Sequence, residues 1–280
     1  MDNSKVISMQ LDHILLESET PQALADFYGL VMKMDVEVKD ESYWLCSAPG
    51  RKVLISDGKS KSLGFSAFRC ESQESLERLR RRMAESDTEI LPSVSPLLIS
   101  ESDFSTRDPD GNLLCFTATK ADGIASDKLS ARLQHVVVAT DDIKPMLRFY
   151  RDVIGFRLSD QVEDEDGNLK VVFLRGDCEH HCFAIFAASS KRLDHHCYET
   201  GGWDQVRDWA DRLAEHNIPI VWGPGRHGPG HNLFFMINDI DGNWLEFSAD
   251  LELIKADRPV GVWEHCEKTL NQWGKGKIRI

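Results

Sequence analysis

The sequence has no long apolar run and no excess of basic residues. Nowhere do about 18 apolar residues follow one another, which is the length a helix needs to cross a bilayer. Acidic residues outnumber basic ones by 46 to 33, so the net charge is −13. Without a basic stripe to neutralise phosphates, general binding to nucleic acid or to an anionic membrane surface is excluded.

A disulfide framework and a signal peptide are also not expected. The seven cysteines are odd in number and irregularly spaced, and this pattern does not predict paired disulfides. The first six residues contain no apolar core of the kind that a signal peptide has. Buried thiols acting as small hydrophobic groups account for the cysteines. We therefore expect a soluble cytoplasmic protein with reduced thiols.

The sequence does contain an internal repeat. The spacing from His13 to Tyr28 recurs from His135 to Tyr150 at a constant offset of 122 residues, within similar strand and helix patterns. Later, two Asp-Gly-Asn segments that end in Phe116 and Phe247 recur at an offset of 131. The second copy has therefore gained roughly nine residues between these points. A chain of 280 residues is long enough for two such domains.

Each copy has the same order of predicted elements: a strand, a helix, strands, an amphipathic helix and further strands. Apolar residues at helical spacing begin the second helix of each copy at residues 75–79 and 206–210. A strand is predicted after each helix, at 90–91 and at 218–221. An Asp-Gly pair before the final strand of each copy is a hairpin signal. The pattern predicts two similar α+β modules.

The predicted boundaries follow from the repeat and from composition. The first module covers residues 1–120 and the second covers 131–250, and a polar segment, 121–130, links them. A tail, 251–280, carries Trp263 and Trp273, which we expect to pack across the two modules, and ends in glycines and lysines.

Comparing the copies isolates the chemistry. Both keep the first histidine, which is His135 in the second copy, but Phe65 stands where the second copy has His195, and Cys115 stands where it has Glu246. The fold therefore does not require the complete set of three polar groups. Two histidines and one carboxylate are the set that holds non-heme Fe(II) with coordination positions open. The alternative is that the histidines are hydrogen-bonded core residues and the glutamate is an edge charge.

The second copy resembles the type I extradiol catechol dioxygenases, which are two-domain members of the vicinal-oxygen-chelate superfamily. The likeness covers most of the chain and is strongest from Leu133 to Asp250. The segments that carry it are 133–137, 149–156, 179–181, 191–195, 223–228 and 241–246. The fold that this resemblance implies is α+β, with tandem βαβββ modules forming two vicinal-oxygen-chelate domains, of which only the second binds metal.

The resemblance also implies the ligands. His135, His195 and Glu246 would bind Fe(II) or, less often, Mn(II). His195 is preferred to its neighbour His196 because the motif places the ligand two residues after an aliphatic residue. Side chains alternate across a strand, so His196 would point the other way, and it is kept as the second choice.

Three further site residues follow from the resemblance. His181, 14 residues before His195, matches an acid–base histidine, and His227, 32 residues after His195, matches a histidine that hydrogen-bonds a substrate oxygen. Met236, nine residues beyond His227, stands where similar enzymes usually have a tyrosine that orients the catechol. A thioether cannot donate a proton, so the substrate or the rate is expected to differ from those of ordinary members.

The implied function is an extradiol ring-cleaving dioxygenase in aromatic-compound degradation. It would open a catechol-type aromatic diol next to its hydroxyls with O2, and it would be a homo-oligomer. A non-redox enzyme of the superfamily (an isomerase, hydrolase or lyase) and a ligand-sequestering binding protein are the alternatives. Arg226 could pair with a substrate carboxylate or with an aspartate, and His231 is interpreted as structural. Trp203, Trp222 and Phe183 are interpreted as core residues.

Overall fold

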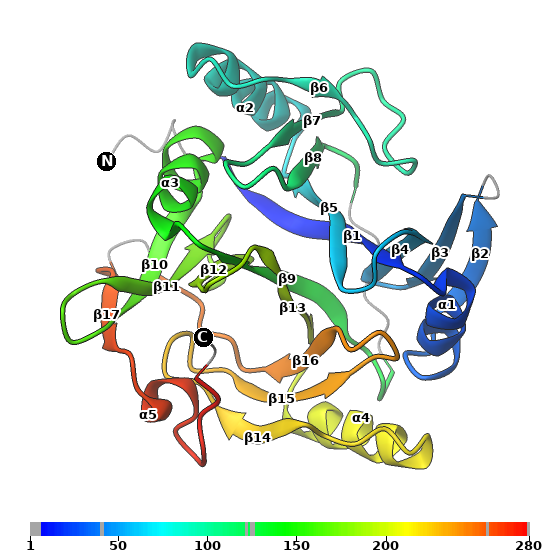
Figure 1. The fold of residues 1–280 in the computed structure, drawn as a ribbon. Coiled ribbons are helices and arrows are strands. Elements are labelled where there is room, and N and C mark those ends of the chain that lie inside the picture. The colour runs from blue at the N-terminus through cyan, green and yellow to red at the C-terminus, as the bar shows by residue number, and fades with distance from the viewer. Residues whose placement is uncertain (1–6, 40–41, 121–122, 124–126, 256–257, 279–280) are drawn as a thin grey trace.

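Two mixed β-sheets lie side by side with helices on their outer faces (Figure 1). The computed structural model describes residues 7–39, 42–120, 123, 127–255 and 258–278. Within these ranges the first sheet has eight strands in the order β2-β3-β4-β1-β5-β8-β7-β6. The second has nine, in the order β14-β15-β16-β13-β9-β12-β11-β10-β17. The predicted α+β class with tandem βαβββ modules is confirmed.

The first module runs from β1 to β8 and the second from β9 to β16, in the order that the repeat predicts. The elements of the first are β1 (Met9–Ser18), α1 (Pro21–Leu30), β2 (Asp35–Lys39), β3 (Tyr43–Ala48), β4 (Arg51–Asp57), β5 (Ser62–Cys70), α2 (Gln73–Glu85), β6 (Leu91–Pro92), β7 (Phe104–Arg107) and β8 (Leu113–Thr117). Those of the second are β9 (Arg132–Thr140), α3 (Ile143–Arg148) with a π-helical turn (Phe149–Ile154), β10 (Arg157–Glu163), β11 (Leu169–Arg175), β12 (Phe183–Ala187), β13 (Arg192–Glu199), α4 (Trp203–Glu215), β14 (Trp222–Arg226), β15 (Leu233–Asn238) and β16 (Trp244–Ala249).

The hairpin signals are confirmed at both predicted places. β7 and β8 pair antiparallel, as do β15 and β16. Gly111 (φ 90°) and Gly242 (φ 81°) take the left-handed conformation that these turns need, which costs glycine little because it has no Cβ. Asp108 and Asp239 begin the turns, and each carboxylate accepts backbone N–H groups two and four residues later.

One strand prediction is wrong. Residues 218–221 lie in an irregular segment after α4, and the strand begins at Trp222 instead. Pro219 has no backbone N–H to donate to a neighbouring strand, so the β-branched residues around it do not form a strand here. β14 begins four residues later than expected, and its first residue, Trp222, places its indole in the interior of the second module.

The modules share one apolar core, and the repeated tyrosines join them. Tyr28 on α1 contacts His196 on β13, with its hydroxyl 3.0 Å from Nε2. Tyr150, its counterpart in the second module, donates to Oδ2 of Asp108 in the first at 3.0 Å. Equivalent residues thus make reciprocal hydrogen bonds across the interface, and all four side chains are buried.

Removing the Tyr150 hydroxyl is expected to destabilise the fold more than removing that of Tyr28. Tyr150→Phe takes a donor from a buried carboxylate, which costs about 1.5–3 kcal/mol, whereas Tyr28→Phe breaks a contact with an imidazole whose pKa burial lowers to about 3, which costs about 1 kcal/mol. Urea denaturation of the two variants measures both costs. A larger loss for Tyr28→Phe would contradict this account.

The segment predicted as a tail adds structure to the second module. β17 (Gly261–Glu264) extends the second sheet by pairing parallel with β10, and α5 (Glu267–Leu270) follows it. Trp263 donates to Asp160 on β10 at 2.7 Å, and Trp273 packs edge-on against Trp203. The expectation that these aromatics pack across the modules is wrong, because both contact the second module. Half of the predicted linker, at 121–122 and 124–126, lies outside the described residues.

Within the described part of the chain, no helix is both long enough and apolar enough to span a membrane.

Candidate metal centre

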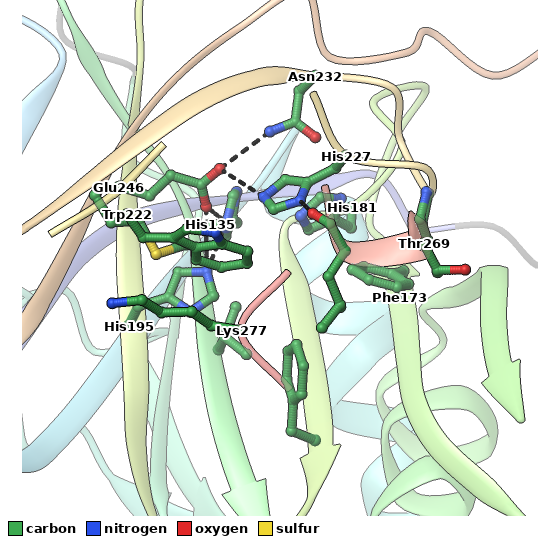
Figure 2. A pocket seen from close by; sticks show the side chains of 15 residues that line it. His135, Phe173, His181, His195, Trp222, His227, Asn232, Glu246, Thr269 and Lys277 are labelled. Atoms are coloured by element: carbon green, nitrogen blue, oxygen red, sulfur yellow. Dashed lines mark hydrogen bonds and ion pairs between the residues drawn. The ribbon is translucent and has the colours of Figure 1, made fainter. Parts of the chain in front are cut away.

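Three adjacent strands of the second sheet, β16, β13 and β9, carry the three candidate ligands. Cys197 on β13 is in register with His135 on β9 and with Glu246 on β16. His195 precedes Cys197 by two residues, so alternation along β13 keeps both side chains on that face. The side chains of His135, His195 and Glu246 converge from the three strands (Figure 2). Each is at most 5% exposed.

The ligand atoms are spaced as a facial triad requires. His135 Nε2 and His195 Nε2 are 3.4 Å apart, and Glu246 Oε2 lies 3.2 Å from each of them. Adjacent ligands of an octahedral ion, at bond lengths of about 2.1 Å, are roughly 3 Å apart. The three side chains therefore fit a divalent transition metal with little rearrangement.

Each histidine is oriented by the residue before it. Oε1 of Gln134 lies 2.5 Å from Nδ1 of His135, and Oδ1 of Asp194 lies 2.6 Å from Nδ1 of His195. These oxygens accept the Nδ1–H hydrogens, which leaves a lone pair on each Nε2 facing the other ligands. Asn232 donates to the second oxygen of Glu246 at 3.1 Å. No sequence pattern predicts these supporting contacts, since they depend on side-chain packing.

The protonation states suit metal binding. Burial, the largest cause, lowers the pKa of His135, so its imidazole is neutral. Burial alone would raise the pKa of Glu246, but the imidazoles of His135, His195 and His227 outweigh it and hold that pKa well below its ordinary value. Neutral imidazoles and an ionised carboxylate are the forms that bind a cation.

A thiol lies beside the triad. Cys197 has its sulfur, together with ligand atoms of His135 and Glu246, in a group within 4.8 Å. Burial raises the pKa of this thiol well above its ordinary value, so it keeps its proton. A protonated thiol is a poor metal ligand. His195, with its Nε2 directed at the other two ligands, is the better third donor.

His196, the second choice, lies on the opposite side of β13. Its ring is fully buried against Tyr28 of the first module and is not part of the described pocket lining. His195 and His196 therefore face opposite sides of β13, as strand alternation predicts.

Among the described residues, the equivalent position of the first module holds no such cluster. His13 has its Nδ1 2.7 Å from Asp12, as the repeat would suggest, but its Nε2 lies 2.7 Å from the hydroxyl of Ser95. Phe65 packs edge-on against the His13 ring, and Cys115 contacts the Ser105 hydroxyl. A serine hydroxyl and apolar packing take the place of ligands here.

A pocket opens over the triad, with about 530 Å³ of empty space that includes open solvent at its mouth. The predicted residues His181, His227 and Met236 all line it. Its other lining residues are Val137, Phe173, Phe186, Trp222, Pro229, Asn232, Thr269, Leu270 and Lys277, besides the triad itself. Most of these are apolar or aromatic, so the pocket suits a flat aromatic ligand with polar groups at one end.

His181 and His227 approach the triad from two sides. The His181 ring packs on that of His135 with centroids 4.3 Å apart. Burial, then the neighbouring imidazoles, lowers the pKa of His181 well below its ordinary value, so the ring is neutral. His227 donates from Nδ1 to the Leu270 carbonyl at 2.6 Å, and its Nε2 lies 3.4 Å from Glu246.

Several pocket residues escaped the sequence-based prediction. Trp222 is buried with the core, as predicted, but it also lines the pocket, whereas Phe183 is a core residue outside the pocket lining. Trp203 is 46% exposed, so its interpretation as core is wrong. Thr269, Leu270 and Lys277 come from the tail segment, which no motif links to the site.

The two undecided residues lie outside the pocket lining. Arg226 Nη2 is 3.6 Å from Asp250 Oδ2, which favours the aspartate alternative, and its guanidinium lies over the Trp273 ring. His231 is exposed in the turn after β14, with a positive φ of 53°.

Known proteins agree with this arrangement. Residues 132–247 match the Glyoxalase/Bleomycin resistance protein/Dioxygenase superfamily model. The chain is 26% identical to metapyrocatechase 2 of Cupriavidus necator, with 94% of this chain and 88% of that protein covered. Its fold is similar to the Mn(II)-bound glyoxalase of Novosphingobium aromaticivorans, with a TM-score of 0.83, 24% identity, and 97% and 93% of the two chains covered. It is also similar to homoprotocatechuate 2,3-dioxygenase of Brevibacterium fuscum, with a TM-score of 0.81, 19% identity, and coverage of 99% and 91%.

Residues 132–247 are therefore a domain of the Glyoxalase/Bleomycin resistance protein/Dioxygenase superfamily. The resemblance of the chain to the two-domain extradiol dioxygenases of this superfamily is confirmed.

Proposed function

We propose that this protein is an extradiol dioxygenase that opens a catechol-type aromatic diol next to its hydroxyls with O2, in aromatic-compound degradation. The observation that carries the proposal is the convergence of His135, His195 and Glu246 at the base of an aromatic-lined pocket. A facial triad of this composition is typical of non-heme Fe(II) oxygenases, and Mn(II) accepts the same donors. Similarity to metapyrocatechase 2 over 94% of this chain supports the same chemistry.

A bound Fe(II) would supply Lewis acidity and the redox chemistry that couples an aromatic diol to O2. Both atoms of O2 enter the product as one ring carbon–carbon bond beside the diol is broken, giving a muconic semialdehyde type of product. The chain's own residues supply binding, orientation and proton transfer. Phe173, Phe186 and Trp222 provide apolar surface for the ring and exclude water from the reacting groups.

His181 and His227 supply the proton chemistry in this proposal. His181 is neutral and borders the triad, so it can take a proton from a substrate hydroxyl and return it later. The Nδ1–H of His227 is already committed to the Leu270 carbonyl, so only Nε2 remains to meet a substrate oxygen. That nitrogen lies on the Glu246 side of the pocket, where the diol oxygens would sit.

The test is anaerobic loading with Fe(II), followed by a panel of catechols. Dioxygenase activity requires one O2 consumed for each yellow ring-opened product formed. Turnover of a substrate without O2 uptake would instead establish a non-redox enzyme of the superfamily. Failure to bind metal would leave a ligand-sequestering protein, because such a binder has no need of the triad. Size-exclusion chromatography with light scattering tests the homo-oligomer that belongs to the same proposal.

The presence of Met236, where similar enzymes usually have a tyrosine, favours the alternative of a non-redox reaction. It is 1% exposed, lines the pocket and lies in register with Glu246 and Trp222 on the neighbouring strands. A thioether offers no proton to a substrate oxygen at this position. The side of the pocket where resembling enzymes have a tyrosine is therefore apolar here.

Restoring a hydroxyl at this position is expected to raise the turnover of unsubstituted catechol. One hydrogen bond to a charged oxygen is worth about 1.5–3 kcal/mol, or about one to two decades in rate if it acts in the transition state. Met236→Tyr should therefore raise kcat, measured by O2 uptake, about 10-fold or more. Met236→Phe is the matched control, because it adds the ring without the donor. Equal rates in the two variants would show that this side of the pocket does not touch the reacting oxygens.

A further inference from the structure

A buried line of polar groups extends behind His181, away from the pocket. Nδ1 of His181 lies 2.9 Å from Nδ1 of His180, and Nε2 of His180 lies 3.1 Å from Oδ2 of Asp160. His180 and Asp160 are 0% exposed. Of these three residues, only His181 is among the described residues that line the pocket. Burying an imidazole and a carboxylate this completely is costly unless they are paired.

The carboxylate at the end of this line is ionised. Burial alone would raise the pKa of Asp160, but His180, Arg258 and Trp263 outweigh it and hold that pKa below its ordinary value. Arg258 Nη2 lies 2.8 Å from Oδ1, and the indole of Trp263 donates to Oδ2 at 2.7 Å. The backbone N–H of Gly261 donates to Oδ1 at 3.1 Å. These three partners come from the segment after β16, which pairing of β17 with β10 holds in place.

The ionised carboxylate decides where the hydrogens lie. A lone pair on Nε2 of His180 would be repelled by Asp160, so this nitrogen carries the hydrogen. Arg258 at 2.8 Å already balances the charge of Asp160, so a second hydrogen on the fully buried His180 ring would add an unpaired charge, and Nδ1 of His180 has the lone pair instead. The two facing Nδ1 atoms need one hydrogen between them, which must belong to His181. Nε2 of His181, the ring nitrogen that His180 does not engage, is left unprotonated.

The backbone of His181 is held as firmly as its ring. Its carbonyl accepts from Nε2 of Gln134 at 2.6 Å, the same side chain whose oxygen orients His135. The backbone N–H of His180 donates to the Glu252 carbonyl at 2.9 Å. Phe173 packs against both imidazoles. The ring of His181 therefore has little freedom to turn.

We propose that Asp160 and His180 are positioning residues that fix the tautomer and the orientation of His181, so that it presents an unprotonated Nε2 to the substrate hydroxyl. The proposal rests on the proposed function, in which His181 is the acid–base group. Neither positioning residue touches the substrate. Their role is to make His181 a proton acceptor before the substrate arrives, and to stabilise the hydrogen on its other nitrogen.

The primary test reads the tautomer in the metal-free, substrate-free protein. Histidine side chains are labelled with ¹⁵N, and the His181 resonances are assigned by their loss in His181→Gln. Wild type should show the Nδ1–H tautomer of His181. His180→Phe keeps a ring of similar size against Phe173 but removes the acceptor, so His181 should shift to the Nε2–H tautomer. His216→Gln, at the end of α4, is the control and should leave the His181 signals unchanged.

Kinetics of the Fe(II)-loaded protein supply the second readout. His180→Phe and Asp160→Asn should each lower kcat about 10- to 100-fold, the usual cost of removing a partner that orients a functional histidine, with little change in KM. Asp160→Asn keeps the shape of the side chain, so it serves if His180→Phe fails to fold. An Nε2–H tautomer in wild type, or an unchanged tautomer in folded variants, would overturn the proposal. A tautomer shift with no dioxygenase activity in wild type would uphold the positioning and overturn the proposed function.

Discussion

Glu246→Ala is expected to remove the metal from the protein and with it all turnover. The carboxylate supplies the only charged donor of the proposed triad, and its Oε2 is 3.2 Å from both imidazole nitrogens. Removing a partner that merely orients a ligand costs about 10- to 100-fold in metal affinity, so removing a ligand should cost more than about 100-fold. Elemental analysis after Fe(II) loading should give about one equivalent per chain for wild type and none for the variant.

The repeat provides a matched control for this experiment. Cys115→Ala changes the residue that occupies the Glu246 position of the first module, where it contacts Ser105. Its metal content should equal that of wild type. Two equivalents in wild type, or one equivalent retained by Glu246→Ala, would contradict the assignment of the metal to the second module's triad.

The neighbouring histidines give a second matched pair. His195→Ala should lose the metal, while His196→Ala should keep it and lose stability, because its ring fills the interface beside Tyr28. The reverse result would show that the wrong member of the pair was chosen. The fold should survive the loss of His195, since the first module folds with Phe65 at that position.

The repeat explains how much of this fold the sequence could predict. Two copies of one module fix the order of elements, and position-by-position comparison separates what the fold needs from what it does not. Phe65 and Cys115 in the first copy show that His195 and Glu246 are not packing requirements. Strand alternation then separates His195 from His196, because only the period of two decides which side each faces.

What could not be predicted depends on contacts between distant segments. Trp222 lines the pocket from the first position of β14, a strand that begins later than the apolar residues before it suggest. Leu270 lines the pocket because the segment after residue 250 lies against the site. β17 is four residues long and pairs with β10 about a hundred positions earlier, which no local pattern encodes. The contacts of Asp160 with Gly261 and Trp263 follow from that pairing, so no local pattern predicts them either.

His181→Ala is the second large effect that we expect, and it should separate proton transfer from metal binding. General acid–base catalysis by one positioned side chain contributes about 10²- to 10⁴-fold, so kcat should fall by that factor while metal content stays at one equivalent per chain. The ring contacts His135 through packing alone, and the Gln134 contact that orients His135 does not involve the His181 side chain.

The matched control is His231→Ala, which removes an exposed histidine from the turn after β14, outside the pocket lining. Metal content and O2 uptake of the two variants are measured side by side, with loaded wild type as reference. Loss of metal in His181→Ala would mean that His181 holds the triad together. An unchanged kcat at full metal content would mean that the substrate's proton leaves by another group. His227 would then be the next to test, because its Nε2 is the other imidazole nitrogen near the triad that can receive a proton from the substrate.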